Sequence, residues 1–398
     1  MNLFIIPSWY PRPTGAGGGS FTKEQAEAIA QLHPEVNVIM SLWGHNIPAV
    51  PVRQPWKWPG KVLWALSQPK NSITKHKGVH EVFNAKVQWS ERLPLGGVKQ
   101  LIKVNRKNLI AAQQKFGKMD IIHAHVSFPA GYVAAILAKE FNIPYVITEH
   151  MSPFPFPSLM VGNKPRAEII HAFNNAHTSI AVSPSLAVRV ASFGLPKPTV
   201  VPNVIDEQAF FINHLAQAKT TFFTLCGIGD QKGIDHLIQA IALWKPNPNQ
   251  FEFRIGGDGP MLAEYQALAK ELCVDNLINW LGNVSREEAP KLFQQCDIYI
   301  MPSRHETFGV VYAEATACGK PIIATRCGGP EFIVNKTNGV LVDVGDIEAI
   351  SQAMQNMVKN LSNYSDQAIR ADFEQRFSRP AVVEKLMEVY EQVIKSKA

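Results

Sequence analysis

Short apolar runs alternate with longer amphipathic segments along most of the chain. Segments such as FTKEQAEAIAQL (21–32) and GYVAAILAKEF (131–141) have the spacing of helices that are apolar on one face. The runs between such segments have the length and β-branched content of buried strands: NLFIIP (2–7), VNVIMSLW (36–43), DIIHAHV (120–126) and PYVITEH (144–150). This βαβα alternation predicts an α/β fold, with a parallel sheet covered by helices on both faces.

The alternation begins again in the second half of the chain. The strands expected there are TFFTLCGIG (221–229), FEFRIGGDG (251–259), NLINWLGNV (276–284), CDIYIMP (296–302), KPIIATRCGG (320–329) and GVLVDVGD (339–346). A boundary falls near Pro202 and Asn203, which favour a turn. We therefore predict two Rossmann-like, doubly wound domains, residues 1–203 and 204–378, facing each other across a cleft. An amphipathic helix at 379–398 ends the chain.

Length and composition agree with this organisation. The 398 residues exceed the roughly 100 to 200 of one domain, and 46% are apolar. No apolar run approaches the roughly 18 to 20 residues of a membrane-spanning helix, and MNLFIIPSWYP lacks the basic region of a signal peptide. Five cysteines, all in the second half, match neither a zinc site nor a disulfide framework. A reducing, cytoplasmic location is expected.

Positive charge is concentrated in one region of the first domain. Between Arg53 and Lys118 there are fourteen Lys or Arg residues against two Glu, and QPWKWPGKVLW (54–64) interleaves tryptophan with lysine. Two interpretations stay open. One is contact with an anionic membrane surface or a phosphate-bearing acceptor, and the other is a solvated basic face with partly buried indoles. Nucleic acid ranks lower, because no recognised binding module surrounds the region.

Candidate chemistry in the first domain follows its strands. Gly18 and Gly19 end a glycine-rich loop before a helix, where backbone N–H groups can approach an anion, although many such loops are merely flexible. His125 lies on the same side of its strand as the histidine two residues earlier, a pair that suits either a metal or hydrogen bonding. Glu149 and His150 stand at another strand end and are candidates on the acceptor side. No acidic third metal ligand is evident.

The stretch RHETFGVVYAEATACGKP (304–321) carries the main candidate site. A helix beginning near Phe308 or Gly309 leaves the N–H groups of Phe308, Gly309 and Val310 free to bind phosphate. Glu306 precedes that helix start and Glu314 lies about two turns into the helix. A nucleotide diphosphate sugar would fit, with Glu306 on the sugar hydroxyls and Glu314 on the ribose. Two solvated glutamates around a helix cap are the alternative.

These residues resemble the retaining glycosyltransferases of family 4, which have the GT-B fold. The likeness covers the glycine-rich loop, HAH, AVSPSLAVRV, VVPNVID, KGIDHLIQA, IGGDGP and E-x7-E followed by ACGKPIIAT and GG. It implies an acceptor-binding first domain, a donor-binding second domain and a final helix that crosses back. By this resemblance Gly18 and Gly19 approach the reacting centre, His125 the donor sugar, Lys232 the diphosphate and Val284 the base. Thr307 joins the donor loop.

One position departs from the family pattern. Family members carry a second diphosphate-binding arginine after the glycine equivalent to Gly227, and here Ile228 stands in its place. Losing one charge-assisted contact costs roughly 1.5 to 3 kcal/mol. Either Arg304 or Arg326 substitutes for it, or activity is low.

The function that we expect is metal-independent, retaining transfer from a UDP- or GDP-sugar to a glycan or polyprenyl-linked acceptor in bacterial polysaccharide or glycoconjugate biosynthesis. Neither a cofactor nor nucleic acid is expected, and the location is cytoplasmic, with peripheral contact to the inner membrane face. The alternatives are a nucleotide-sugar epimerase, a phosphorylase, a glycoside hydrolase with two carboxylates, and a sugar-nucleotide-binding protein without catalysis.

Overall fold

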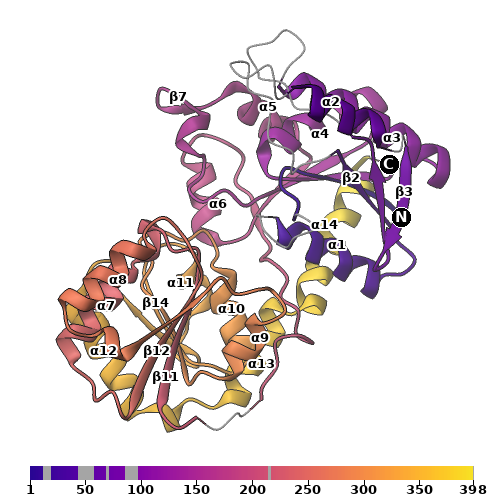
Figure 1. The fold of residues 1–398 in the computed structure, drawn as a ribbon. Coiled ribbons are helices and arrows are strands. Elements are labelled where there is room, and N and C mark those ends of the chain that lie inside the picture. The colour runs from indigo at the N-terminus through magenta and orange to yellow at the C-terminus, as the bar shows by residue number, and fades with distance from the viewer. Residues whose placement is uncertain (12–18, 44–57, 69–70, 86–96, 214–216, 398) are drawn as a thin grey trace. The chain divides into compact units, whose positions relative to one another are not determined.

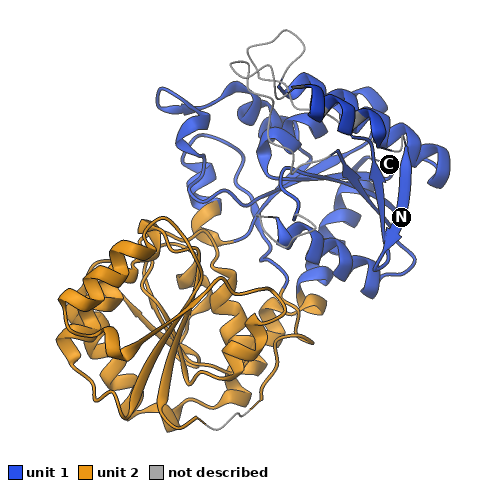
Figure 2. Ribbon diagram, viewed as in Figure 1, with its two compact units in different colours: residues 1–182, 187–204, 382–398 blue, residues 183–186, 205–381 orange. Residues whose placement is uncertain are grey.

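The computed structural model describes residues 1–11, 19–43, 58–68, 71–85, 97–213 and 217–397, and the chain forms two compact units (Figures 1 and 2). Unit 1 comprises residues 1–182, 187–204 and 382–398, and unit 2 comprises residues 183–186 and 205–381. The main stretch of unit 2 thus begins after Val204, whereas the sequence predicts the domain boundary after residue 203.

Unit 1 contains a sheet flanked by helices. Its strands are β1 (Asn2–Pro7), β2 (Asn37–Leu42), β3 (Ser72–His76), β4 (Val79–Phe83), β5 (Ile121–His125), β6 (Tyr145–Glu149), β9 (Thr178–Ala181) and β10 (Thr199–Val200), with β7 (Met160–Val161) and β8 (Lys164–Pro165) as a separate pair. Its helices are α1 (Ser20–Leu32), α2 (Trp58–Ser67), α3 (Val98–Phe116), α4 (Tyr132–Phe141), α5 (Ala167–Asn175), most of α6 (Pro184–Ala191), and the turns η2 (Ser127–Gly131) and η3 (Pro157–Leu159).

The sheet of unit 1 has the order β10-β9-β6-β5-β1-β2-β4-β3. All its neighbouring pairs are parallel except β3 and β4, which form an antiparallel hairpin. The sheet is thus parallel, as predicted, except at this edge. The cause is local: Lys77 and Gly78 both have positive φ, 44° and 85°, the conformation of a tight hairpin turn.

Alternate residues of the central strand β1 enter two different cores. Phe4 and Ile6 pack with residues of α3 and α4, whereas Leu3 and Ile5 pack with residues of α1 and the final helix α14 (Arg379–Lys397). This is the period of two that a strand buried on both faces shows. Unit 1 thus needs the end of the chain to cover one face of its sheet.

Unit 2 contains a fully parallel sheet. Its strands are β11 (Thr220–Leu225), β12 (Phe251–Gly256), β13 (Ile278–Gly282), β14 (Ile298–Met301), β15 (Ile322–Thr325) and β16 (Gly339–Val342), in the order β13-β12-β11-β14-β15-β16. Its helices are α7 (Ile234–Trp244), α8 (Leu262–Glu271), α9 (Ala289–Gln294), α10 (Val310–Ala317), α11 (Pro330–Ile333), α12 (Ile347–Lys359) and α13 (Asp366–Phe377), with the turns η4 (Asp230–Lys232), η5 (Asp275–Leu277) and η6 (Leu361–Asn363).

Helices cover both faces of this second sheet (Figure 1). One face packs against α7, α8 and α12 in a single apolar cluster. On the other face, Phe223 of β11 meets Phe293 of α9, with ring centroids 5.1 Å apart, and Tyr299 of β14 meets Tyr312 of α10 at 5.6 Å. Within the described ranges, no helix is long and apolar enough to cross a membrane.

Candidate active site

The strand order of unit 2 reverses between β11 and β14. The chain adds β12 and β13 on one side of β11 and then returns to place β14, β15 and β16 on the other. Loops that leave two neighbouring strands in opposite directions open a crevice at the carboxyl edge of the sheet, where α/β proteins bind ligands. The loops in question are residues 226–233 and 302–309, and they hold Lys232 and Glu306.

Close backbone contact joins these two loops. Gly233 has φ of 66°, and a Cβ there would lie 2.0 Å from the carbonyl oxygen of Pro302. The backbone N–H of Arg304 donates to the carbonyl of Gln231 over 2.8 Å. This close approach of the two loops requires glycine at position 233. Between the same loops, the Lys232 ammonium donates a hydrogen bond to the Glu306 carboxylate.

Two further glycines fix the backbone of Glu306. The N–H of Glu306 donates to Cys327 over 3.3 Å, and its carbonyl accepts from Gly329 over 2.7 Å. A Cβ at Gly328, whose φ is 122°, would lie 2.6 Å from that same carbonyl oxygen. A Cβ at Gly329 would lie 2.4 Å from the carbonyl oxygen of Phe308. The absence of side chains at Gly328 and Gly329 therefore allows the Glu306 loop to pack against the backbone that follows β15.

The helix that follows starts as an open anion site. Gly309 is the N-cap of α10, with φ of 83°, and no side chain caps this helix end. Within the described chain, the N–H groups of Phe308, Gly309 and Val310 donate to no acceptor. The Thr307 carbonyl accepts from the Ser183 hydroxyl over 2.5 Å. Free N–H groups and the positive end of the helix dipole both favour phosphate here.

Glu314 is buried deeper on the same helix. Its residue is 1% exposed, and one carboxylate oxygen pairs with the Arg286 guanidinium. The other oxygen, Oε2, is buried without a hydrogen-bond partner among the described residues. Val284 lies close by in sequence, and its Cγ2 would be 2.9 Å from a Cβ on Gly256, so it sits at the carboxyl ends of β12 and β13. Arg286 was not among the residues predicted from the sequence, where its only signal is its place after a strand.

Ile228 contributes no charge to this site. Its side chain is buried in the core of unit 2, and its backbone N–H donates to Asp258 over 2.9 Å. The two suggested substitutes are engaged elsewhere. Arg304 forms a bidentate pair with Asp235, at 2.9 and 2.5 Å, and Arg326 pairs with Asp343 at 3.0 Å. Among the described residues, neither guanidinium forms a hydrogen bond or ion pair with Glu306.

In unit 1, three histidines stack at the carboxyl ends of β5 and β6. The ring centroids of His123 and His125 are 4.3 Å apart, and those of His125 and His150 are 5.3 Å apart. His123 bonds to the hydroxyls of Tyr390 and Thr148, each over 2.7 Å. The two histidines of β5 thus point the same way, as the strand period predicts.

Burial keeps this stack neutral. Desolvation lowers the pKa of His123 and of His150 to about 3, and it lowers the pKa of His125 well below the ordinary value, with a smaller contribution from the neighbouring histidines. The Nδ1 of His125 lies 3.1 Å from Nε2 of His150. His125 Nε2 and His150 Nδ1 have no partner within the described ranges, so each can serve a bound hydroxyl.

The carboxylate of Glu149, a predicted acceptor-side residue, accepts hydrogen bonds from the backbone. It is fully buried, and its oxygens accept from the backbone N–H groups of Ser127, His150 and Met151, over 3.1, 2.8 and 2.9 Å. Burial raises its pKa, and these hydrogen bonds oppose the rise. The carboxylate thus links the loop after β5 to the loop after β6 through hydrogen bonds from their backbone N–H groups. Sequence position alone did not reveal those donors.

The glycine-rich loop is partly described. Gly19 is the N-cap of α1 with φ of 103°, and a Cβ there would lie 2.5 Å from the Trp9 carbonyl carbon and oxygen. Gly18 lies outside the described residues. In the part of the chain that the structure describes, no group of three His, Cys, Asp or Glu residues could hold a metal ion.

Comparison with known proteins identifies the family. Residues 206–373 match the family model for glycosyl transferases group 1, and residues 15–209 match that for glycosyltransferase family 4. An uncharacterized glycosyltransferase from Methanocaldococcus jannaschii is 28% identical, with 75% of this chain and 82% of that protein covered. A D-inositol 3-phosphate glycosyltransferase from Pseudarthrobacter chlorophenolicus is 26% identical, with 94% and 88% covered.

A solved structure shares the architecture of the whole chain. HepE of Anabaena, crystallised with UDP, has a TM-score of 0.71 at 19% identity, with 98% of this chain and 100% of that chain covered. At this identity the likeness establishes the fold. The two family models show that this chain belongs to the group 1, family 4 glycosyltransferases, and the likeness to HepE shows their GT-B fold of two Rossmann-like units.

Proposed function

We propose that this glycosyltransferase moves a sugar from a UDP- or GDP-sugar to a glycan or lipid-linked acceptor, with retention of the anomeric configuration. The arrangement at the β11/β14 switch point carries the proposal: Lys232 and Glu306 meet just before the uncapped start of α10. An ammonium group and free N–H groups suit a diphosphate, and the carboxylate suits the hydroxyls of the sugar beyond it.

A donor would satisfy both members of the Lys232–Glu306 pair. Phosphate oxygens accept from the ammonium, and sugar hydroxyls donate to the carboxylate, so each group exchanges one charged partner for another. The unpartnered Oε2 of Glu314 can likewise accept a hydrogen bond from the bound nucleotide. We assign it to the ribose diol and assign the base to Val284, at the ends of β12 and β13. The nucleotide would then extend along the carboxyl edge of the sheet.

The proposed reaction needs no strong base from the protein. The acceptor hydroxyl attacks the anomeric carbon from the face that the diphosphate leaves. The new C–O bond forms as the bond to phosphate breaks, and the departing phosphate oxygen takes the hydroxyl proton. Lys232 and the N–H groups of α10 stabilise the charge that develops on the phosphate, in place of a metal ion. Gly18, Gly19 and His125 are assigned to the reacting centre and the donor sugar.

Relatives support a nucleotide donor. HepE has been solved with UDP and with UDP-glucose. A GDP-mannose-dependent mannosyltransferase of Mycolicibacterium smegmatis is 33% identical to this chain over 136 residues. These two proteins point to different bases, which is why both UDP and GDP belong in the experiment.

The test begins with a thermal-shift screen of UDP, GDP, ADP and their sugars, followed by a transfer assay with the sugar nucleotide that binds. Glu306→Gln keeps the side-chain volume and removes the charge. We expect it to lower kcat/KM by about 100-fold or more, as loss of a key electrostatic contact does. Asp343→Asn, an exposed carboxylate paired with Arg326, is the matched control. Full activity of a folded Glu306→Gln protein would refute the site.

Ile228 favours a second candidate, a sugar-nucleotide-binding protein without turnover. Position 228 is buried and apolar, and Arg304 and Arg326 are paired elsewhere, so the leaving group has one cation fewer than the family pattern provides. Binding of UDP or GDP with neither transfer nor hydrolysis of any donor would select this candidate over the enzyme.

The acceptor is assigned to unit 1. Helix α2 exposes Leu63 and Leu66, which are 65% and 69% exposed, next to the basic, tryptophan-containing segment of the sequence. We propose that this region meets an anionic membrane surface that presents a polyprenyl-linked acceptor. Co-sedimentation with anionic vesicles at low salt, and its loss in Leu63→Ser with Leu66→Ser, is the expected result. Equal binding to neutral vesicles would argue against the electrostatic part.

A further inference from the structure

A cavity of about 370 Å³ lies in unit 2, outside the proposed donor site. Its walls come from η4, α7 and α8, and the two helices α7 and α8 lie together on one face of the sheet (Figure 1). The volume falls within the roughly 300 to 1,000 Å³ of small-molecule sites. Four carboxylates line it: Asp230, Asp235, Glu264 and Glu271.

These carboxylates exceed the positive charge that contacts them. Arg304 pairs with Asp235 at 2.5 Å and with Asp230 at 3.6 Å. Glu264 and Glu271 form no ion pair with any residue in the described ranges. His236 also contacts Arg304, and burial lowers its pKa, so it adds no charge near neutral pH. The cavity therefore carries excess negative charge, which a cationic ligand would balance.

Tyr265 provides a second, independent sign of a ligand. This residue lines the cavity and is 2% exposed, and its buried hydroxyl has no hydrogen-bond partner in the described structure. Burial raises its pKa, and the charges of Asp235, Asp230 and Glu264 raise it further against the opposing charge of Arg304, so the phenol stays protonated. A phenol oxygen beside carboxylates can accept a hydrogen bond from a bound cation, and leaving it unsatisfied costs about 1 to 3 kcal/mol.

The lining distinguishes an organic cation from a metal ion. In the described chain, no three acidic, histidine or cysteine side chains converge closely enough to hold a metal. On α8, Glu264, Leu268 and Glu271 are spaced i, i+4 and i+7, so they share one helix face with an apolar residue between two carboxylates. Ammonium groups separated by methylenes match that alternation, because methylenes pack on apolar side chains while each ammonium meets a carboxylate.

We propose that this cavity binds an aliphatic polyamine. The proposal goes beyond the assigned reaction and does not depend on it, because Lys232, Glu306, Glu314 and the start of α10 do not line the cavity. Spermidine is the probe, and isothermal titration against the full chain at low salt is the measurement. We expect saturable binding of one spermidine per chain that weakens as salt is added, since the contacts are electrostatic.

Three variants test the lining. Glu264→Gln combined with Glu271→Gln should weaken spermidine binding at least tenfold. Tyr265→Phe removes only the unpartnered hydroxyl, so the protein should keep its stability while binding weakens severalfold. Glu384→Gln removes an exposed carboxylate from unit 1 and should bind spermidine like the wild type.

Other results would overturn the proposal. These are non-saturable binding, displacement of spermidine by magnesium at equal charge concentration, or wild-type affinity in Tyr265→Phe. UDP and GDP binding is measured on the same samples. Loss of spermidine binding with nucleotide binding intact would refute only the cavity, and the reverse result would refute only the donor site.

Discussion

Glu314 shows how a single buried atom can report on a ligand. An ionised carboxylate in the interior is costly unless both oxygens are satisfied. Arg286 satisfies one oxygen, and the other has no partner among the described residues. Charge-assisted hydrogen bonds are worth roughly 1.5 to 3 kcal/mol each. A ribose diol would relieve this deficit, so Glu314 should be a determinant of nucleotide affinity rather than of chemistry.

The corresponding prediction uses a modified ligand. Glu314→Gln should raise the Kd of the preferred nucleoside diphosphate by about tenfold or more, from the loss of about 1.5 kcal/mol or more. The 2′-deoxy form of that nucleotide should bind the wild type more weakly and should lose less on mutation. Calorimetric titration of both ligands with both proteins measures the coupling. If Glu314→Gln weakened binding of the ribose and deoxyribose forms equally, Glu314 would not contact the ribose 2′-hydroxyl.

The histidine stack leads to a prediction about pH. His123 and His150 have folded-state pKa values near 3, against about 6.5 in an unfolded chain. Between these values the unfolded chain binds more protons, so stability falls as pH falls below about 6.5, by up to about 1.4 kcal/mol per pH unit for each histidine. The raised pKa of Glu149 acts in the opposite sense above its ordinary value.

His150→Phe should reduce this slope. Phenylalanine keeps the stacking on Phe21, whose ring centroid lies 4.1 Å from that of His150, and cannot take up a proton. The free energy of unfolding, from urea titrations between about pH 5 and 7, should then depend less on pH, by up to about 1.4 kcal/mol per unit. The exposed His171→Phe serves as control and should keep the wild-type slope. An unchanged slope in His150→Phe would mean that this ring titrates when folded.

At the scale of elements, glycines decide how the site loops meet. Gly233 and Gly345 both have positive φ, 66° and 82°, but only Gly233 touches another loop closely. Gly345→Ala should cost about 1 to 2 kcal/mol, the strain of a left-handed alanine. Gly233→Ala should cost about 1 to 3 kcal/mol more, because its Cβ meets the Pro302 carbonyl.

The same substitution should impair function. Shifting the η4 loop moves Lys232 away from Glu306, and a misplacement of about 1 Å can cost about 100-fold in rate. Denaturant unfolding and kcat/KM, measured on both alanine variants, separate the two effects. If Gly233→Ala matched Gly345→Ala in stability and kept full activity, the contact with Pro302 would not hold the site together.

The sequence predicts these elements better than it predicts their contacts. The position of α10, the open N–H groups before Val310 and the place of Glu314 all follow from local pattern, because a helix start is set by a few neighbouring residues. The antiparallel β3–β4 edge escaped because its turn, Lys77 and Gly78, lacks the usual Asn-Gly or Asp-Gly signal. Strand ends also indicated where the candidate residues lie, although they did not reveal that backbone N–H groups occupy the Glu149 carboxylate.

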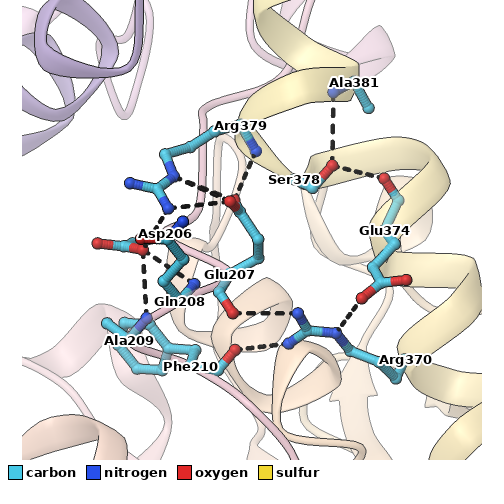
Figure 3. Close-up of polar contacts among 10 residues, drawn as sticks. All are labelled: Asp206, Glu207, Gln208, Ala209, Phe210, Arg370, Glu374, Ser378, Arg379 and Ala381. Carbon is cyan, nitrogen blue, oxygen red and sulfur yellow. Dashed lines mark hydrogen bonds and ion pairs between the residues drawn. The ribbon is translucent and has the colours of Figure 1, made fainter. Parts of the chain in front are cut away.

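At the scale of the whole molecule, a polar network joins the two ends of the long stretch of unit 2, residues 205–381 (Figure 3). The Ile205 N–H donates to Phe377 over 3.1 Å, and Arg379 binds the Glu207 carboxylate, with contacts of 2.9 to 3.2 Å. Arg370 donates to the carbonyls of Glu207 and Phe210, at 3.0 and 2.6 Å. The first and last residues of the main part of unit 2 are thus held side by side.

Arg370 also links this network to the site helix. It donates to the carbonyl of Ala317, the last residue of α10, over 2.7 Å, where a cation complements the helix dipole. Partners such as Arg370 and Phe210, or His123 and Tyr390, are separated by 160 and 267 residues in the sequence. Local pattern gives no signal for pairs so far apart, which is why the sequence analysis placed the elements without these contacts.

The last prediction concerns α14, which begins in unit 2 and completes unit 1. Its buried face packs into the core that covers β1: Val382, Val383, Leu386, Val389, Tyr390 and Val393. At about 1.5 to 3 kcal/mol for each large apolar side chain, this face is worth about as much as the 5 to 15 kcal/mol that stabilises a whole domain. Deleting residues 382–398 should therefore unfold unit 1 and leave unit 2 intact, because Arg379 and its partners remain.

Calorimetry and limited proteolysis can locate that loss. We expect the shortened chain to lose one thermal transition and to be cut before residue 205, while residues 205–381 resist protease and keep the nucleotide affinity of the full chain. Deleting only residues 396–398 should change neither property. Tyr390→Phe isolates the hydrogen bond to His123 and should lower the unit 1 transition by about 1 kcal/mol. If the chain without residues 382–398 kept both thermal transitions, α14 would not be required for the folding of unit 1.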